Sequence, residues 1–218
     1  YAYGETKQGY KNLKGVVTIG SPVAFEYNQK GWTYLLKAIP PGHPSIRFNP
    51  KKLLEDKEKI IKLMEKHGAN PENLEEDIFK RYIEYGFDNY LSLKVIKQFA
   101  IFFRYKDFCK YPRCPWITAV ARRIPFINKA VVPLSYKRRL HRFKTPLLAI
   151  AGGNDQQAPP KEVKYVIDHV GSYDVTYREF SKGNMGILFD YGHLDFHLGI
   201  RAKEEVYPVI YQWLVEHI

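Results

Sequence analysis

Three short apolar runs along the chain have the pattern of strands buried in a parallel sheet. They cover residues 14–20, 146–151 and 173–177, and the third run is more polar than the others. Glycines bound the first run and follow the second. Uninterrupted runs rich in Val, Ile, Leu and Ala are typical of strands that are covered on both faces. We therefore predict three buried strands.

Two segments after residue 144 repeat their apolar residues at the spacing of a helix. One face comprises Val163, Val166, Ile167 and Val170, and the other comprises Ala202, Val206, Val209, Ile210, Trp213 and Leu214. The order strand, helix, strand, helix is typical of a parallel sheet with helices packed on it. The pattern predicts an α/β fold in which one amphipathic helix ends the chain.

The middle of the chain, residues 23–141, has a helical pattern and no strand pattern of comparable quality. One helix is predicted over 51–67 and ends at Gly68, and Asn70 provides a cap for the next helix. A further helix is predicted over 90–108. The simplest account is a large helical block inserted between two strands of the sheet.

The predicted organisation therefore has three segments. Residues 1–22 form a first core segment, 23–141 the helical insert, and 142–218 a second core segment. Aromatic residues of the insert pack it against the sheet, which is their commoner use, or line an apolar pocket. They are Phe99, Phe102, Phe103, Tyr105, Phe108 and Trp116.

The composition is that of a folded protein with an excess of positive charge. Of the 218 residues 45% are hydrophobic, which is enough for one substantial core, and the net charge is +11. Most basic residues are interleaved with acidic ones on the predicted helices, which is typical of a solvated face and predicts no nucleic-acid partner. A locally unopposed cluster leaves weak binding to an anionic surface as a secondary hypothesis. It comprises Arg122, Arg123, Lys137, Arg138, Arg139, His141 and Arg142.

The sequence says little about the compartment. No segment approaches the roughly 18 apolar residues of a membrane span, so we expect a soluble protein. The first residues have neither an initiator Met nor the grading of a secretory signal, and we expect the chain to continue upstream of Tyr1. Cys109 and Cys114 are too few for a disulfide framework, and we expect two separate thiols. The cytoplasm is only slightly favoured.

Residues that can carry chemistry follow the second and third strands. Asp155 lies in a loop opened by Gly152 and Gly153, where open α/β sheets place their sites. His193 follows Gly192 in the loop before the last helices. A carboxylate that orients an imidazole and stabilises its protonated form is the support half of a nucleophile, base and acid triad.

Each of these residues also has a simpler interpretation. Asp155 could be a turn or cap residue, and His193 could be bonded to backbone alone. His193, Asp195 and His197 alternate and could hold a metal in an extended segment, but no second ligand cluster supports this. We therefore predict no metal or cofactor, and we expect Asp195 to cap the last helix. The joint occurrence of Asp155 and His193 favours catalysis.

These motifs resemble the α/β-hydrolase superfamily, especially its acid-lipase and esterase-like branches. The resemblance rests on Gly-Gly-Asn-Asp with Pro-Pro at 152–160, and on Tyr-Gly-His-Leu-Asp-Phe at 191–196 before a terminal amphipathic helix. The family's chain order is nucleophile, acid, base, which implies Asp155 as the acid and His193 as the base. The insert lies where the family carries its lid.

The sequence departs from the family in having no Gly-x-Ser-x-Gly elbow. The resemblance implies that the nucleophilic Ser lies upstream of Tyr1, in the same chain or a companion chain that completes the hydrolase. Ser21 is a poor substitute because Pro22 removes a backbone N–H from the place of an oxyanion donor. Tyr1 is not a side-chain nucleophile of the kind that an N-terminal mechanism needs.

The leading hypothesis is a serine hydrolase of lipase or esterase type that acts on an apolar ester. An acyltransferase or polyester synthase on the same fold is an alternative, because the same triad serves when an alcohol or thiol replaces water. A second alternative is a non-catalytic module of the same fold that binds a lipid, peptide or polyanion. Fold alone does not decide between them.

Overall fold

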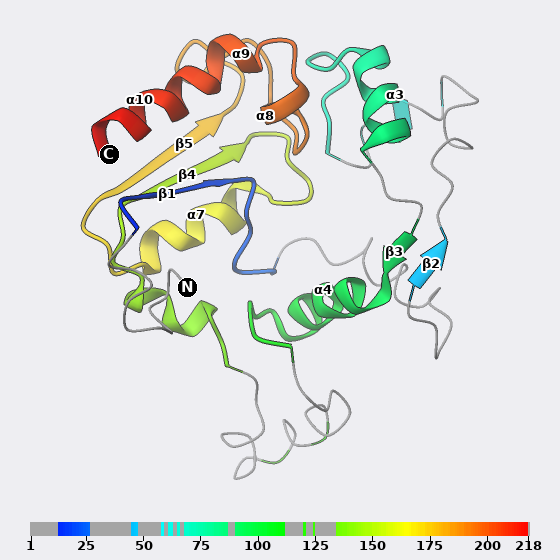
Figure 1. Cartoon of the computed structure of the whole chain (residues 1–218). Coiled ribbons are helices and arrows are strands. Elements are labelled where there is room, and N and C mark those ends of the chain that lie inside the picture. The colour runs from blue at the N-terminus through cyan, green and yellow to red at the C-terminus, as the bar shows by residue number, and fades with distance from the viewer. Residues whose placement is uncertain are drawn as a thin grey trace.

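A parallel three-stranded sheet forms the core of the protein (Figure 1). The computed structural model describes residues 13–26, 45–47, 68–86, 90–111 and 134–217, together with isolated residues between 58 and 124. The strands are β1 (Val16–Ile19), β4 (Leu147–Gly152) and β5 (Val175–Phe180), in the order β1-β4-β5. All three strands predicted from the sequence are confirmed.

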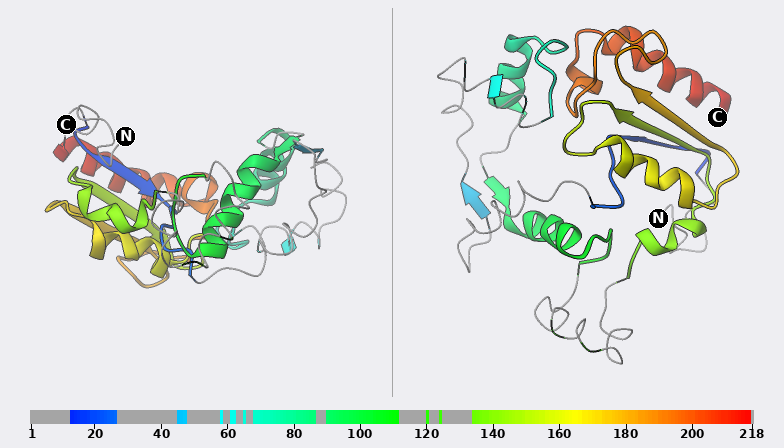
Figure 2. Two further views of the ribbon diagram at one scale, coloured as in Figure 1. Left: turned by 90° about the horizontal axis from the view of Figure 1, so that it is seen from below. Right: turned by 180° about the vertical axis from the view of Figure 1, so that it is seen from behind.

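Strand β4 lies between β1 and β5 and is buried along its whole length. Because successive side chains of a strand point to opposite faces, its residues separate into two sets. Leu148 and Ile150 pack in a cluster with Trp213 of α10 (Tyr207–His217). Ala149 and Ala151 pack with Val163 of α7 (Pro160–His169). The sheet is therefore covered by α10 on one face and by α7 on the other (Figure 2).

The last helical segment is broken, where the sequence pattern predicted one helix. A short α8 (Asp195–Leu198) is followed by α9 (Ala202–Glu205) and α10, with Val206 between the last two. Pro208 has no N–H to donate to the carbonyl of Glu204, so the helical hydrogen bonds cannot continue through this point. The apolar face continues across the break, because Ala202, Val206 and Trp213 share one cluster.

The segment between β1 and β4 contains a small sheet as well as helices, which corrects the prediction of no strand there. Strand β2 (Ser45–Arg47) pairs antiparallel with β3 (Tyr90–Ser92). The helix predicted over 90–108 therefore begins later, as α4 (Leu93–Tyr105), and ends before Lys106, which has a positive φ of 50°.

Asn70 does not begin a helix. It opens a turn in which its side chain accepts a hydrogen bond from the N–H of Glu72, and α3 (Glu76–Tyr85) begins only after Glu75. The helix predicted over 51–67 lies almost entirely outside the described residues, as does Trp116.

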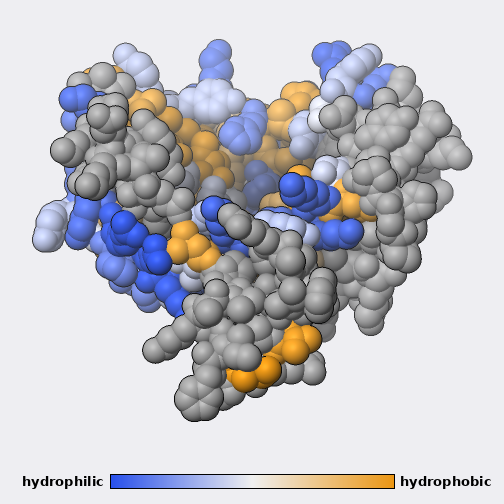
Figure 3. Space-filling view, turned by 60° about the horizontal axis from the view of Figure 1, so that its bottom comes forward, coloured by the Kyte–Doolittle hydropathy of each residue, from blue (hydrophilic) through white to orange (hydrophobic). Residues whose placement is uncertain are grey.

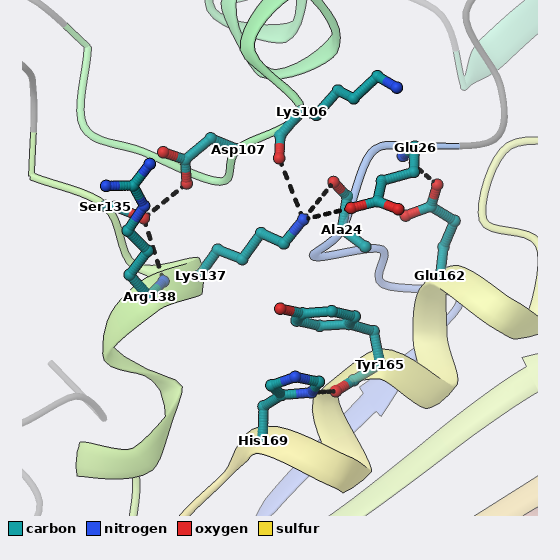
Figure 4. Close-up of polar contacts among 10 residues, drawn as sticks. All are labelled: Ala24, Glu26, Lys106, Asp107, Ser135, Lys137, Arg138, Glu162, Tyr165 and His169. Carbon is teal, nitrogen blue, oxygen red and sulfur yellow. Dashed lines mark hydrogen bonds and ion pairs between the residues drawn. The ribbon is translucent and has the colours of Figure 1, made fainter.

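The segment between β1 and β4, called the insert below, is fixed to the core near its beginning and its end (Figure 4). Lys137, at the start of the 3-10 helix η3 (Lys137–Arg142), donates to the carbonyls of Ala24 and Lys106 and to the carboxylate of Glu26 at 2.9 Å. Its ammonium also lies 4.7 Å from the ring centre of Tyr165 on α7. One side chain thus joins the beginning of the insert, helix α4 and the core.

Aromatic residues close the same junction. Phe25, which adopts a positive φ of 56°, packs against Phe102, Phe103 and Phe108 with ring centres 5.0, 5.3 and 6.3 Å away. Phe102 and Phe103 are buried with Cys109 in this cluster. These phenylalanines pack the insert onto the residues that follow β1.

Candidate active site

The loop after β4 holds Asp155 in a buried position. The Asp155 side chain is 0% exposed, and its Oδ1 accepts the backbone N–H groups of Gln157 and Ala158, both at 2.8 Å. These two bonds make Asp155 a turn residue, as one interpretation of the sequence had it. They use one carboxylate oxygen and leave Oδ2 for another partner.

That partner is His193. Its Nδ1 lies 2.9 Å from Asp155 Oδ2, and the imidazole is 31% exposed. Within the described residues the ring has Asp155 as its hydrogen-bond partner. The structure therefore brings together the two residues that the sequence singled out 38 positions apart, with the carboxylate buried and the imidazole partly exposed.

Tyr191 fixes the loop that carries His193 to the core. Tyr191 is buried in a cluster with Phe180 and Phe196, and its hydroxyl donates to Glu205 of α9 at 2.8 Å. Burial and this carboxylate both raise the pKa of Tyr191, so the phenol stays neutral and keeps its proton for Glu205. The backbone of the loop is thereby fixed to β5 and to α9.

Gly20 at the end of β1 contacts the pair, and the sequence analysis treated it only as a boundary of the strand. Its φ is +52°, and a Cβ built on it would lie 2.9 Å from His193 Nδ1 and 3.0 Å from Asp155 Oδ2. A side chain at this position would collide with both. The sequence signal was available, since a glycine at the carboxyl end of a parallel strand lies beside the site.

The sequence analysis judged Ser21 a poor nucleophile. In the structure Ser21 is exposed, and its hydroxyl donates to the carbonyl of Ile19 at 3.2 Å. Among the described residues no group of three or more His, Cys, Asp and Glu side chains is arranged to hold a metal ion. His197 is exposed, whereas Asp195 is fully buried.

Asp195 is not a cap of the last helix α10. It is the first residue of α8, and its carboxylate accepts the N–H of Gly192 at 2.7 Å and the N–H of Asn70 at 3.0 Å. Burial raises the pKa of Asp195 to about 6, although these N–H donors act in the opposite direction. Asn70 therefore reaches the site from the insert, a contact that the sequence pattern did not predict.

The basic cluster is divided by the structure. The Lys137 side chain is only 12% exposed and is engaged at the base of the insert. Arg138, Arg139, His141 and Arg142 are exposed or largely so along η3, and Arg122 and Arg123 lie outside the described residues. In the described part of the chain no helix is long and apolar enough to cross a membrane.

Comparison with known proteins identifies the fold of the chain. No family model matches the chain. It is 31% identical over 86 residues to triacylglycerol lipase 2 of Arabidopsis thaliana, an alignment that covers 39% of this chain and 19% of that lipase. The crystal structure of a Paleococcus ferrophilus monoacylglycerol lipase superposes with a TM-score of 0.54 at 19% identity, over all of this chain and 63% of the lipase. The chain has the α/β-hydrolase fold.

Asp155 follows β4 and His193 follows β5, which is the order in which an acid and a base occur along chains of this fold. The solved structure of VinJ is a more distant neighbour, with a TM-score of 0.37 at 16% identity over 94% of this chain and 58% of VinJ. This chain thus spans 63% of the archaeal lipase and aligns with about a fifth of the plant lipase.

Proposed function

We propose that this protein is a serine hydrolase that cleaves apolar carboxylic esters, with His193 as general base and Asp155 as the residue that orients it. The observation that carries the proposal is the 2.9 Å contact between His193 Nδ1 and Asp155 Oδ2. Because Nδ1 donates to the carboxylate, Nε2 is the nitrogen left to accept a proton from a nucleophile.

The reaction follows from this arrangement. A serine hydroxyl gives its proton to His193 Nε2 as its oxygen attacks the ester carbonyl, and the resulting imidazolium is stabilised by the Asp155 carboxylate. His193 then returns the proton to the leaving alcohol, which departs from the acyl-enzyme. Water then gives a proton to His193 Nε2 as its oxygen attacks the carbonyl of the acyl-enzyme. His193 returns this proton to the serine oxygen as the carboxylic acid leaves. Two backbone N–H groups hold the Asp155 carboxylate in place through Oδ1, while Oδ2 faces the imidazole.

The serine would belong to a Gly-x-Ser-x-Gly elbow outside residues 1–218, before β1 in the chain order of the fold. Its segment would come from the same polypeptide or a companion chain. Among the described residues β1 pairs only with β4, and the proposed segment would add a strand at the other edge of β1. A strand added there would end beside Gly20 and therefore beside His193.

Two features support an apolar substrate. Both named lipases act on glycerides by their titles, and this chain resembles them in fold or in a local sequence match. Figure 3 shows a hollow at the centre of the face in view, with hydrophobic residues coloured orange along part of its wall. An apolar wall stabilises an acyl chain by removing it from water, by about 0.8 kcal/mol per CH2 group.

The experiment is hydrolysis of p-nitrophenyl esters of increasing acyl length by the full-length protein. We expect kcat/KM to rise from the acetate to the medium-chain esters and to be lost in His193→Ala. The matched control is His217→Ala, because His217 also pairs with an aspartate, Asp174, at 3.0 Å but at the opposite end of β5. Equal activity of the two variants would refute the role of His193.

Acyl transfer is the alternative within the same chemistry. The same assay repeated with an alcohol or thiol acceptor distinguishes it, since a transferase forms the new ester or thioester faster than the free acid. Absence of both products from wild-type protein would favour the non-catalytic module.

A further inference from the structure

The turn that carries His193 is closed by a reciprocal pair of hydrogen bonds. The carboxylate of Asp195 accepts the N–H of Gly192 at 2.7 Å, and the N–H of Asp195 donates to the carbonyl of Gly192 at 3.3 Å. His193 lies between these two residues. The first bond resembles one half of a capping box, in which a side chain three residues on accepts the backbone N–H at the start of the turn, whereas the second bond joins backbone groups because Gly192 has no side chain.

A segment of the insert, Gly68–Asn70, contacts this turn, and we call it the strap. The backbone N–H of Asn70 donates to both carboxylate oxygens of Asp195, at 3.2 and 3.0 Å, and its side-chain amide donates to the carbonyl of Asp190 at 2.8 Å. Asn70 thus bonds to the loop on both sides of His193, with partners 120 and 125 residues away in sequence. The bonded groups are buried or partly buried.

Gly68 brings the strap into contact with both catalytic loops. A Cβ on Gly68 would lie 3.2 Å from the Cβ of His193 and 3.6 Å from the N–H nitrogen of Gln156, the residue after Asp155. A Cβ on Gly192 would lie only 1.9 Å from the carbonyl oxygen of Gly68. The two backbones therefore touch, with no room for a side chain at Gly192, and a side chain at Gly68 would be both tight and strained by the φ of +72°.

We propose that Asp195 is a positioning residue for His193. Its carboxylate links the turn that carries His193 to the strap Gly68–Asn70, so that the insert and this turn keep a fixed position relative to each other. The proposal rests on the proposed function of His193 as the base. Asp195 does not touch the reacting atoms in this arrangement; it acts through the backbone of Gly192 and through Asn70.

A buried carboxylate is costly to keep for packing alone, because burying a charge disfavours the folded state. Asp195 is 0% exposed, and its bonds run to the residue that precedes His193 and to the strap. A side chain that only filled space here could be apolar. The carboxylate instead supplies acceptors to the N–H groups of Gly192 and Asn70, which belong to two separate segments.

The test uses NMR of the full-length protein and observes the proton on His193 Nδ1, which resonates far downfield when it is hydrogen-bonded to a buried carboxylate. We expect Asp195→Asn to broaden this resonance and to speed its exchange with water at least tenfold, since the amide replaces one acceptor oxygen by an NH2 group and removes the negative charge that holds the N–H groups of Gly192 and Asn70. The control is Asp174→Asn, which removes the carboxylate that pairs with another histidine, His217, away from the site.

A second variant keeps the test decisive if Asp195→Asn does not fold. Asn70→Ala removes the side-chain bond to the Asp190 carbonyl but leaves the backbone N–H that donates to Asp195. We expect faster Nδ1 proton exchange in this variant too, together with a lower kcat at nearly unchanged KM for ester hydrolysis. A purely structural role would lower the melting temperature and leave the exchange rate and kcat as in wild type.

The outcomes separate this inference from the function it rests on. Nδ1 proton exchange and kcat that match wild type in the folded variants would overturn the positioning role of Asp195 and leave the hydrolase proposal standing. Absence of a downfield Nδ1 proton from wild-type protein, with equal ester hydrolysis in His193→Ala, would overturn the proposed function itself.

Discussion

Gly20→Ala should damage the active site much more than it damages the fold. The wild-type φ of +52° costs a residue with a Cβ about 1–2 kcal/mol. The new methyl group would also lie 2.9 Å from His193 Nδ1 and 3.0 Å from Asp155 Oδ2, closer than a carbon atom tolerates. The imidazole or the carboxylate must therefore move, and the 2.9 Å bond between them must lengthen.

The expected loss of activity follows from that bond. A hydrogen bond to a charged group contributes about 1.5–3 kcal/mol, and each 1.36 kcal/mol in the barrier is tenfold in rate. We therefore expect kcat/KM for ester hydrolysis to fall by roughly 10-fold to 150-fold. The melting temperature should fall by only a few degrees, because about 1 kcal/mol shifts a domain of this size by about 2–4 °C.

The chain offers a control for backbone strain. Gly183 has a φ of +79°, and a Cβ built on it would meet nothing within 4 Å. Gly183→Ala therefore introduces a comparable strain without a contact at the site. If Gly20→Ala and Gly183→Ala lost the same stability and the same activity, the steric argument at the catalytic pair would be wrong.

Three further predictions concern separate features. Asp155→Asn should keep the turn, because an amide oxygen can still accept from the N–H groups of residues 157 and 158. It should nevertheless lower kcat by about 10³–10⁴-fold, because the amide presents an N–H to His193. Unchanged kcat would contradict the pairing. A bond to the Trp213 carbonyl and the contact with Asp174 raise the pKa of His217 above 6.5, so the stability from this pair is fully present below that pH and is lost as the pH rises through the raised pKa. Asp174→Asn should flatten that part of a urea-unfolding profile against pH, and an unaltered profile would refute this linkage. Lys137→Met should remove three hydrogen bonds at the base of the insert and destabilise the protein by about 1–3 kcal/mol in urea unfolding, with limited proteolysis cutting the insert before the core; equal protection of both would contradict its role as the joint.

The core of the fold was predictable because it depends on local patterns. Continuous apolar runs identified β1, β4 and β5, and helical spacing identified α7. The approach of Asp155 to His193 was also predictable in outline, since carboxyl ends of neighbouring parallel strands meet at one edge of a sheet. The 2.9 Å distance between Asp155 and His193, and the choice of partner for each Asp155 oxygen, depend on loop conformation. Hydrophobic periodicity contains no information on loop conformation.

What the sequence missed depends on tertiary contacts or on single backbone groups. The pairing of β2 with β3 involves strands of three residues, which are too short for a hydrophobic period to show. Pro208 breaks a helix whose apolar face continues, so the face alone suggested one helix. Asn70 has the residue type of a helix cap, and only its contacts with Asp190 and Asp195, more than 100 positions away, show its place at the site.

The central claim is that His193, oriented by Asp155, activates a serine outside residues 1–218. The measurement that tests it most directly is the intact mass of the full-length protein before and after reaction with a fluorophosphonate, followed by peptide mapping of the adduct. We predict a single adduct on a Ser of a Gly-x-Ser-x-Gly segment outside residues 1–218, lost in His193→Ala and retained in His217→Ala. An adduct that survives in His193→Ala, or one on Ser21, would contradict the account.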